Sequence, residues 1–178
     1  VTVRTEVENL QPIARQVSVD LNLEGKKVTQ EVNLAPKERK TVVFTPDTHK
    51  ALELKSPRLW WPNNYGRQEL YTMDVVVAEK GVPSDSKKVR FGVRELSYEL
   101  EVCFPDDSIR RVEYRPTVMG QGEPIFDNIN RKYIEGGMCM PRLKKNVSSD
   151  ILVPAPDKAM QHYMVIKVNG RRIFCKGG

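Results

Sequence analysis

Residues 17–23 read VSVDLNL and residues 1–9 read VTVRTEVEN, and in both stretches apolar and polar side chains alternate. A period of two residues is typical of β-strands with one buried face. Similar short runs occupy residues 28–34, 40–44, 52–54, 71–79 and 87–92, and the last continues through 96–104. Gly and Pro residues separate these runs, as they do at turns. The pattern predicts an all-β fold, an immunoglobulin-like antiparallel β-sandwich over residues 1–104.

The sequence changes character beyond residue 104. Six prolines lie among scattered glycines with no sustained periodicity, which predicts a loop-rich insertion over residues 105–163. Alternation returns at residues 164–168, and the next two residues, Asn169 and Gly170, form the dipeptide favoured in two-residue hairpin turns. We therefore expect a loop-rich C-terminal extension that ends in a β-hairpin within residues 164–178.

Composition narrows the class of protein. The chain has 178 residues, of which 39% are hydrophobic, and a chain of this length can bury a core without disulfides or metal. No run of 18 apolar residues occurs, so we expect no membrane span. The two histidines have no neighbouring ligand residues at metal-site spacing, and no nucleotide-binding glycine motif is present. We expect neither a metal nor a cofactor.

Three cysteines, Cys103, Cys139 and Cys175, are widely spaced and odd in number. This pattern fits neither a disulfide framework nor a paired Cys-x-x-Cys zinc site. The pattern favours free thiols, although two of the three could still pair in an oxidising compartment.

The net charge of +6 is concentrated in the last part of the chain, where residues 105–178 carry 13 Lys and Arg against 8 Asp and Glu. The basic pairs are scattered, and aromatic residues do not interleave with them as they do in strands that stack bases. We expect no nucleic-acid partner. A basic surface that packs on an acidic neighbour would explain the asymmetry equally well.

Two adjacent carboxylates, Asp106 and Asp107, are the nearest approach to an acid and base pair. Acid and base catalysis by a carboxylate pair needs two carboxyl groups that face each other across a substrate, which sequence neighbours rarely do. Their position after Phe104 and Pro105 favours a turn. We therefore expect no catalytic residue in this chain.

The segment LWWPNNYG at residues 59–66 places both tryptophans side by side among turn residues. One explanation is packing, with an indole closing the end of the sandwich. The other is an exposed indole that offers its face to a sugar ring. Because adjacent residues in an extended chain point to opposite sides, each tryptophan could do one of these jobs.

Three ordered motifs, LWWPNNYGRQELYTMDV at 59–75, FGVREL at 91–96 and KVNGRRIFCKGG at 167–178, resemble the sandwich domain of glycoside hydrolase family 2. The Trp-Trp-Pro-Asn form and the Cys-Lys-Gly-Gly end are similar to the exo-β-D-glucosaminidase and β-mannosidase branch. The sequence departs from that branch at Asn64, where Gly is common, and at Val93, where Phe or Ile is usual. Neither change undermines the fold, because Asn tolerates a positive φ and Val is an apolar substitute.

The resemblance implies that this chain, which starts at Val1, is the middle piece of a longer enzyme. In that family an N-terminal jelly-roll domain precedes the sandwich, and a catalytic TIM barrel follows the Asn-Gly hairpin and carries both glutamates of a retaining mechanism. The fragment alone would then be inactive and structural, its partners being the jelly roll, the barrel and the carbohydrate substrate of the parent. Secretion or a periplasmic location fits such a parent. The alternative is an independent carbohydrate-binding module that uses Trp60 and Trp61.

The resemblance also implies roles for particular residues. Candidates for the rim of a sugar site, or for a contact between domains, are Trp60, Trp61, Asn63 and Tyr65. Residues of the structural motifs are Phe91, Gly92, Arg94, Asn169 and Gly170. For Arg94 we expect a buried ion pair or a role in capping carbonyl groups.

Overall fold

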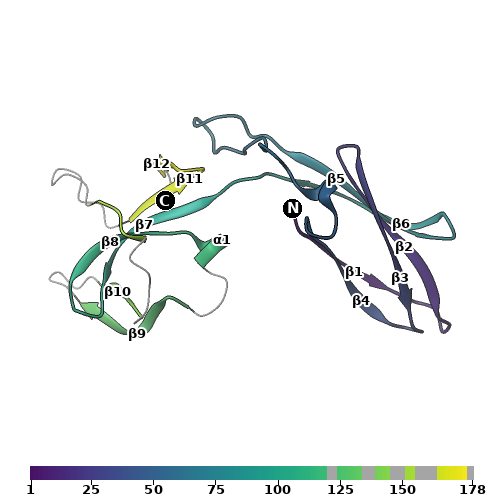
Figure 1. Ribbon diagram of the computed structural model, residues 1–178, viewed down its shortest axis with the longest axis horizontal. Helices are drawn as coiled ribbons and strands as arrows, with labels where there is room; N and C mark the ends of the chain where they lie inside the picture. Colours follow the sequence, from purple (N-terminus) through teal and green to yellow (C-terminus); the bar gives the residue numbers. More distant parts are fainter. Residues whose placement is uncertain (120–123, 134–138, 145–150, 155–163, 176–178) are drawn as a thin grey trace. The chain divides into compact units, whose positions relative to one another are not determined.

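The computed structural model of the chain is built almost entirely from β-strands (Figure 1). The residues that it describes are 1–119, 124–133, 139–144, 151–154 and 164–175.

The chain divides into two compact units. The first consists of Val1–Trp60 and Gln68–Val93, and the second of Trp61–Arg67 and Arg94–Gly178. The chain therefore passes from one unit to the other three times, after residues 60, 67 and 93.

Six strands make up the first unit. They are β1 (Val3–Glu8), β2 (Arg15–Leu23), β3 (Lys26–Leu34), β4 (Arg39–Phe44), β5 (Tyr71–Glu79) and β6 (Val82–Phe91). Strands β1 and β4 form a two-stranded sheet, and the other four form a sheet in the order β3-β2-β5-β6. Every pairing within these two sheets is antiparallel (Figure 1).

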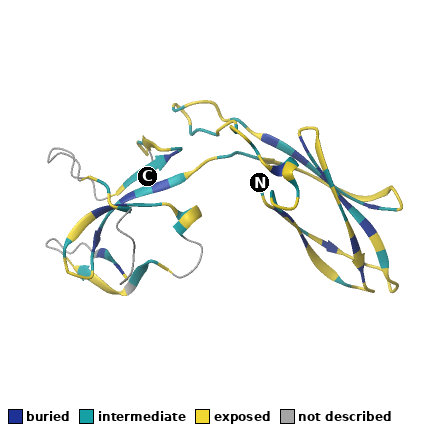
Figure 2. Cartoon of the chain, in the orientation of Figure 1, coloured by how far each residue is buried: buried dark blue, intermediate teal, exposed yellow. Residues whose placement is uncertain are grey.

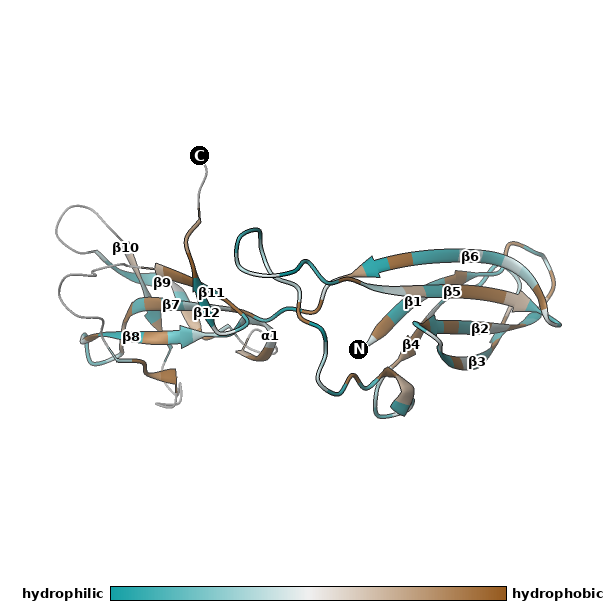
Figure 3. Cartoon of the chain, turned by 90° about the horizontal axis from the view of Figure 1, so that it is seen from above, coloured by the Kyte–Doolittle hydropathy of each residue, from teal (hydrophilic) through white to brown (hydrophobic). Residues whose placement is uncertain are grey.

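One apolar core joins the two sheets. Alternate residues along β2, which are Val17, Val19, Leu21 and Leu23, are buried, while the residues between them are only half-buried (Figure 2). Phe44 from β4 is completely buried in the same cluster. Figure 3 shows that β5 is largely apolar, whereas its neighbour β6 at the edge of the sheet is mostly hydrophilic. This arrangement confirms the predicted antiparallel β-sandwich.

The prediction of a strand at residues 52–54 is wrong. A 3-10 turn, η1 (Lys50–Leu52), occupies this place, and the amide of Leu52 donates to the carbonyl of His49 at 2.9 Å. Leu52 is fully buried in the core of the first unit. A three-residue run is too short to show a period of two, so its apolar residues indicated burial but not the backbone conformation.

The second unit contains a six-stranded sheet and one short helix. Its elements are β7 (Leu96–Cys103), β8 (Ile109–Tyr114), α1 (Pro116–Met119), β9 (Phe126–Tyr133), β10 (Cys139–Leu143), β11 (Met164–Val168) and β12 (Arg171–Ile173). The sheet order is β12-β11-β7-β10-β9, with β8 also paired to β7. A small core formed by Val102, Val112 and Leu143 packs beneath it.

The boundary between the units differs from the expected one at residue 104. Strand β7 pairs with β8, β10 and β11 and with no strand of the first unit, so the sandwich ends at Val93. The described part of residues 105–163 also contains β8, α1, β9 and β10 between its loops. The sequence did not reveal β9, FDNINRKY, because its apolar residues do not alternate regularly. The remainder of that expected insertion lies outside the described residues.

The predicted terminal hairpin is confirmed. Strands β11 and β12 pair antiparallel from Val168 and Arg171 outward. Asn169 and Gly170 between them have φ angles of 50° and 77°, the left-handed region that a type I′ turn requires at both central positions.

Two of the three cysteines fall within the described residues as free thiols. Cys103 is buried and Cys175 is exposed, in agreement with the expectation for these two. The side chain of Cys139 lies outside the described part of the chain.

We expect Phe44→Ala to lower the free energy of unfolding by about 3–5 kcal/mol, because it removes a fully buried aromatic ring and leaves a cavity. The matched control is Val43→Ala on the same strand, whose side chain is 40% exposed and whose loss should cost less than about 1 kcal/mol. Urea unfolding followed by circular dichroism measures both. Equal costs for the two variants would contradict the assigned core.

Candidate functional site

The tryptophan pair lies where the chain first passes between the two units. Trp60 belongs to the first unit and Trp61 to the second. Each indole packs on a glycine of its own unit, Trp60 on Gly92 and Trp61 on Gly66. Both tryptophans are half-buried.

The contact between Trp60 and Gly92 explains the glycine of the FGVREL motif. A Cβ atom at Gly92 would lie only 2.7 Å from Cβ of Trp60, closer than carbon atoms can approach. The amide of Trp60 donates a 2.8 Å hydrogen bond to the carbonyl of Val93. Two motifs that lie far apart in the sequence are thus joined by a backbone hydrogen bond and by packing of the Trp60 side chain.

Residues 61–67 form a compact turn within the second unit. The amide of Trp61 donates to the carbonyl of Arg67 at 3.1 Å, and the amide of Tyr65 donates to that of Pro62 at 3.1 Å. Asn64 has φ = 69°, so the Asn that replaces the usual Gly does occupy the left-handed region. Asn63 beside it is exposed.

Tyr65 fastens this turn to the end of the terminal hairpin. Its hydroxyl accepts a 2.7 Å hydrogen bond from the amide of Phe174. The guanidinium carbon of Arg171 lies 5.4 Å from the centre of its ring, within cation–π range. The Tyr65 hydroxyl therefore already has a partner within the second unit.

The remaining residues of the structural motifs include Phe91 and Asn169, which contact other residues of the chain. Phe91 stacks on Tyr71 with ring centres 5.7 Å apart. The side-chain oxygen of Asn169 accepts the amide of Glu95 at 2.9 Å, and the amide of Asn169 donates to the carbonyl of Glu95 at 2.9 Å. Arg94 is exposed, so the expectation of a buried ion pair for it is corrected. Its neighbour Glu95 connects this segment to the hairpin turn.

The carboxylates Asp106 and Asp107 occupy a turn, as predicted. Asp106 accepts the amide of Ser108 at 3.0 Å and pairs with Arg110 at 2.6 Å. Asp107 has φ = 63° and pairs with Arg142 at 2.7 Å. Hydrogen bonds from Ser108 lower the pKa of Asp106, and a hydrogen bond from Arg142 lowers that of Asp107. Both carboxylates help to hold the link between β7 and β8.

A buried charged cluster on the sheet of the second unit was not predicted. Glu99 on β7 and Glu113 on β8 lie directly opposite each other, an arrangement in which like charges repel. Lys167 of β11 removes the conflict, because its Nζ lies 3.3 Å from a carboxylate oxygen of each. Arg111 and Arg172 bind Glu99 as well, at 3.2 Å and 3.0 Å.

The surroundings of the two glutamates favour their ionised forms. Burial alone would raise the pKa of Glu99, but hydrogen bonds from Lys167, Arg111 and Arg172 outweigh it and hold that pKa below its ordinary value. For Glu113, burial is outweighed by hydrogen bonds from Ser97 and Lys167, and its pKa is also lowered. The general acid of a glycosidase needs a raised pKa. The cluster is therefore better suited to holding neighbouring strands together than to acid catalysis.

The sequence held a signal for this cluster. Polar or charged residues stand at every second position in SYELE at 97–101 and in RVEYR at 111–115, so they share one face of each strand. The sequence alone gave no binding partner for the basic pairs at 110–111 and 171–172. In the structure one arginine of each pair forms an ion pair with Glu99, namely Arg111 and Arg172.

The described residues show no cluster of potential metal ligands. No three His, Cys, Asp or Glu side chains among them are grouped as metal ligands would be. Likewise, no helix within the described ranges is long and apolar enough to cross a membrane.

The fold defines the first unit as an antiparallel β-sandwich, and comparison with known proteins gives the family. The model of the glycosyl hydrolases family 2 matches residues 1–94, which end at the boundary of the first unit. The chain belongs to this family.

Its relatives include exo-β-D-glucosaminidases from Amycolatopsis orientalis, 39% identical over 99 residues, and Hypocrea jecorina, 36% identical over 102 residues. These matches cover 56% and 54% of this chain. A mannosylglycoprotein endo-β-mannosidase from Lilium longiflorum is 30% identical over 90 residues, 50% of this chain. The crystal structure of the A. orientalis exo-chitosanase CsxA is also similar, with 34% identity over 70% of this chain and a TM-score of 0.50.

The chain spans only a small part of these proteins. It covers 9% of the A. orientalis enzyme and of the L. longiflorum enzyme and 11% of the H. jecorina enzyme. In the comparison of structures it covers 13% of the CsxA chain.

We expect Gly92→Ala to destabilise the first unit by about 1–3 kcal/mol, because the added methyl group overlaps the Trp60 side chain. In a Trp60→Gly background the same change should cost clearly less, since all the Trp60 side-chain atoms that it meets, Cβ included, are gone. Urea unfolding of the four proteins in this double-mutant cycle measures the coupling. Additive costs would show that Trp60 does not pack on Gly92.

We expect Glu99→Gln to destabilise the second unit by about 3–5 kcal/mol at pH 7, because it removes the buried counter-charge of Arg111 and one of the two carboxylates that bind Lys167. The control Glu8→Gln removes an exposed pair with Arg39 and should cost less than about 1 kcal/mol. The folded-state pKa of Glu99 is lowered, so its stabilising effect is present above its unfolded pKa and disappears as the pH falls through the folded one. The difference between wild type and Glu99→Gln should therefore shrink on acidification below the ordinary value of 4.5. Urea unfolding from pH 7 to pH 3 measures it, and a constant difference would contradict the assignment.

Proposed function

We propose that this chain is the non-catalytic, structural sandwich segment of a retaining β-glycosidase of the exo-β-D-glucosaminidase or β-mannosidase type, which acts in carbohydrate degradation. The observation that carries the proposal is the position of the family match. It falls on the first unit, and the matched stretch makes up only 9% and 11% of the two exo-β-D-glucosaminidases that share it. Bond cleavage would then belong to groups supplied by the rest of the parent enzyme.

The geometry of the tryptophan turn supports a structural role. Each indole has one side against a glycine, and the Tyr65 hydroxyl is occupied by the amide of Phe174. A stacking platform for sugars would instead present open aromatic faces side by side. The immunoglobulin-like description of the first unit is part of the same proposal, because its two antiparallel layers share one core.

The proposed partners are other domains of the same polypeptide. By resemblance they are an N-terminal jelly roll and a catalytic TIM barrel that carries two opposed glutamates, and the parent would be secreted or periplasmic. Within that assembly the turn at 61–67 is our candidate for the rim of the sugar site, because Asn63 is exposed and both indoles keep part of their surface in solvent.

We expect the purified chain neither to hydrolyse PNP-β-D-glucosamine nor to bind chitosan or mannan fragments with measurable affinity. A chromogenic assay measures the first, and isothermal titration calorimetry the second. Turnover by the purified chain would overturn the proposal. Binding that Trp60→Ala or Trp61→Ala abolishes would favour an independent carbohydrate-binding module, and the matched control for those variants is Phe174→Ala, whose ring is 73% exposed.

A further inference from the structure

The sandwich of the first unit is uneven. Its two-stranded sheet, β1 and β4, faces a sheet of four strands. Neighbouring strands lie about 4.8 Å apart, so the smaller sheet spans only half the width of the larger one. Part of the inward face of the larger sheet is therefore left without a covering strand.

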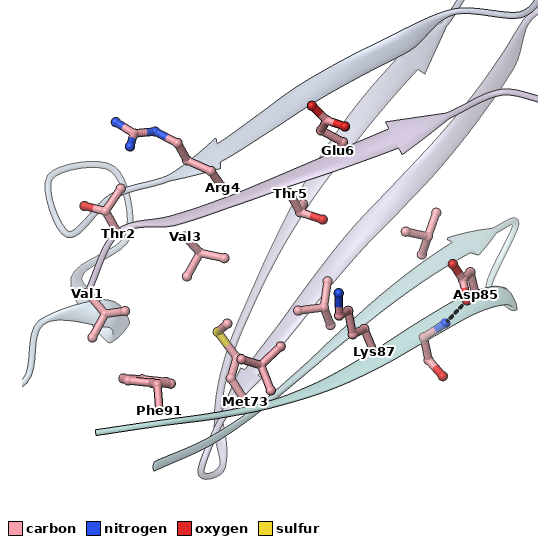
Figure 4. Close-up of a pocket in the computed structure, with 14 residues that line it drawn as sticks. Val1, Thr2, Val3, Arg4, Thr5, Glu6, Met73, Asp85, Lys87 and Phe91 are labelled. Atoms are coloured by element: carbon pink, nitrogen blue, oxygen red, sulfur yellow. Dashed lines mark hydrogen bonds between the residues drawn. The ribbon is translucent and has the colours of Figure 1, made fainter. Parts of the chain in front are cut away.

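A cleft beside β1 marks the uncovered part. It has a volume of about 730 Å³ and is lined by β1 on one side and by β5 and β6 on the other. Figure 4 shows Val1 and Val3 on the β1 side of this space, with Met73 and Phe91 on the opposite side. Apolar side chains thus line one end of the cleft.

The other end of the cleft is polar. Lys87 and Asp85 lie there on β6, opposite Thr5 and Glu6 of β1 (Figure 4). Lys87 pairs across the sheet with Val75, just as Phe91 pairs with Tyr71. Lys87 and Phe91 therefore belong to the inward face of the larger sheet. On β1, Thr5 shares the inward face with the buried Val3 and Val7, whereas Glu6 lies on the exposed face.

Strand β1 has one free edge. It pairs with β4 on one side, and no other described strand pairs with it. An unpaired strand edge presents a row of backbone N–H and C=O groups that can bind a further strand. Here that edge borders the apolar end of the cleft, so one added strand would gain both ladder hydrogen bonds and apolar burial.

We propose that this edge binds one further β-strand, supplied by another segment of the parent polypeptide. The strand pairs with β1 and covers Val89 and Phe91. Its inward side chains are apolar over Phe91 and acidic over Lys87, because a lysine on a newly covered face needs a counter-charge. The proposal rests on the proposed function, since it takes this chain as part of a longer enzyme, as the relatives suggest, of which the match covers only 9% and 11%.

A single strand fits this place better than a second copy of the chain. A second cleft, lined by residues of β3 and β4, lies between the sheets at their other edge, so the larger sheet extends past the smaller one on both sides. A second sandwich that approached β1 edge to edge would bring its own β6 into the space that β6 of the first copy already occupies.

The test uses the whole chain and a synthetic nine-residue peptide of alternating Thr and Val, with one inward Val replaced by Glu. We expect the peptide to slow hydrogen exchange of amides in β1 and to shift the NMR signals of Val89 and Phe91. A peptide of the same sequence, N-methylated on every second amide so that it cannot pair, should have neither effect.

Charge reversal tests the position of the strand. In Lys87→Glu the Glu peptide should bind about fivefold more weakly, and a matched Lys peptide should recover that loss, because an exposed ion pair contributes up to about 1 kcal/mol. Lys87 is exposed, so the variant should fold. Lys88→Glu on the opposite face of β6 is the matched control and should leave both affinities unchanged.

Three results would overturn the proposal. They are undiminished binding of the N-methylated peptide, protection at β3 or β4 instead of β1, and dimerisation of the chain through β1. Each concerns strand pairing alone and is read without any sugar. Failure here therefore leaves the glycosidase assignment standing, and turnover by the purified chain would leave the strand site standing.

Discussion

The apolar face of β2 and β5 has to be removed from water, and most of the first unit follows from this requirement. Leu21 and Leu23 on β2 and Met73 on β5 are almost completely buried, and each large apolar side chain buried in this way contributes about 1.5–3 kcal/mol. Strands β1 and β4 cover this face, and Leu52 closes the core from a 3-10 turn. Uneven coverage by two strands also creates the open cleft beside β1.

The second unit is held by different forces. Its apolar core has three fully enclosed members, Val102, Val112 and Leu143, within its described residues. The buried ion pairs around Glu99 join β7, β8, β11 and β12 on the sheet. Buried pairs add little net stability but strongly disfavour any arrangement that leaves one charge without its partner. The cluster thus serves more to fix which strands pair than to strengthen the unit.

Much of the first unit could be predicted from sequence because its strands alternate regularly and its turns contain Gly or Pro. The hairpin at Asn169 and Gly170 was predictable for the same local reason. The sheet to which β7 belongs could not be predicted, because its residues would alternate in the same way in either sheet. Only its pairing with β8 and β11 places β7 in the second unit. The bond from the Phe174 amide to the Tyr65 hydroxyl spans 109 positions, and no local pattern could announce it. The burial expected for an ion pair of Arg94 was wrong because a motif shows that a residue recurs, not how far its side chain is buried.

The triple passage of the chain between its units has a consequence for how such enzymes can exchange parts during evolution. Residues 61–67 are encoded inside the sandwich segment, yet they belong to the second unit and bind its terminal hairpin through Tyr65. A single recombination breakpoint after Val93 would therefore carry a foreign turn into the second unit along with the new sandwich. Successful shuffling of this segment among glycosidases requires that the turn and the hairpin that receives it be inherited together, which couples two gene regions about a hundred codons apart.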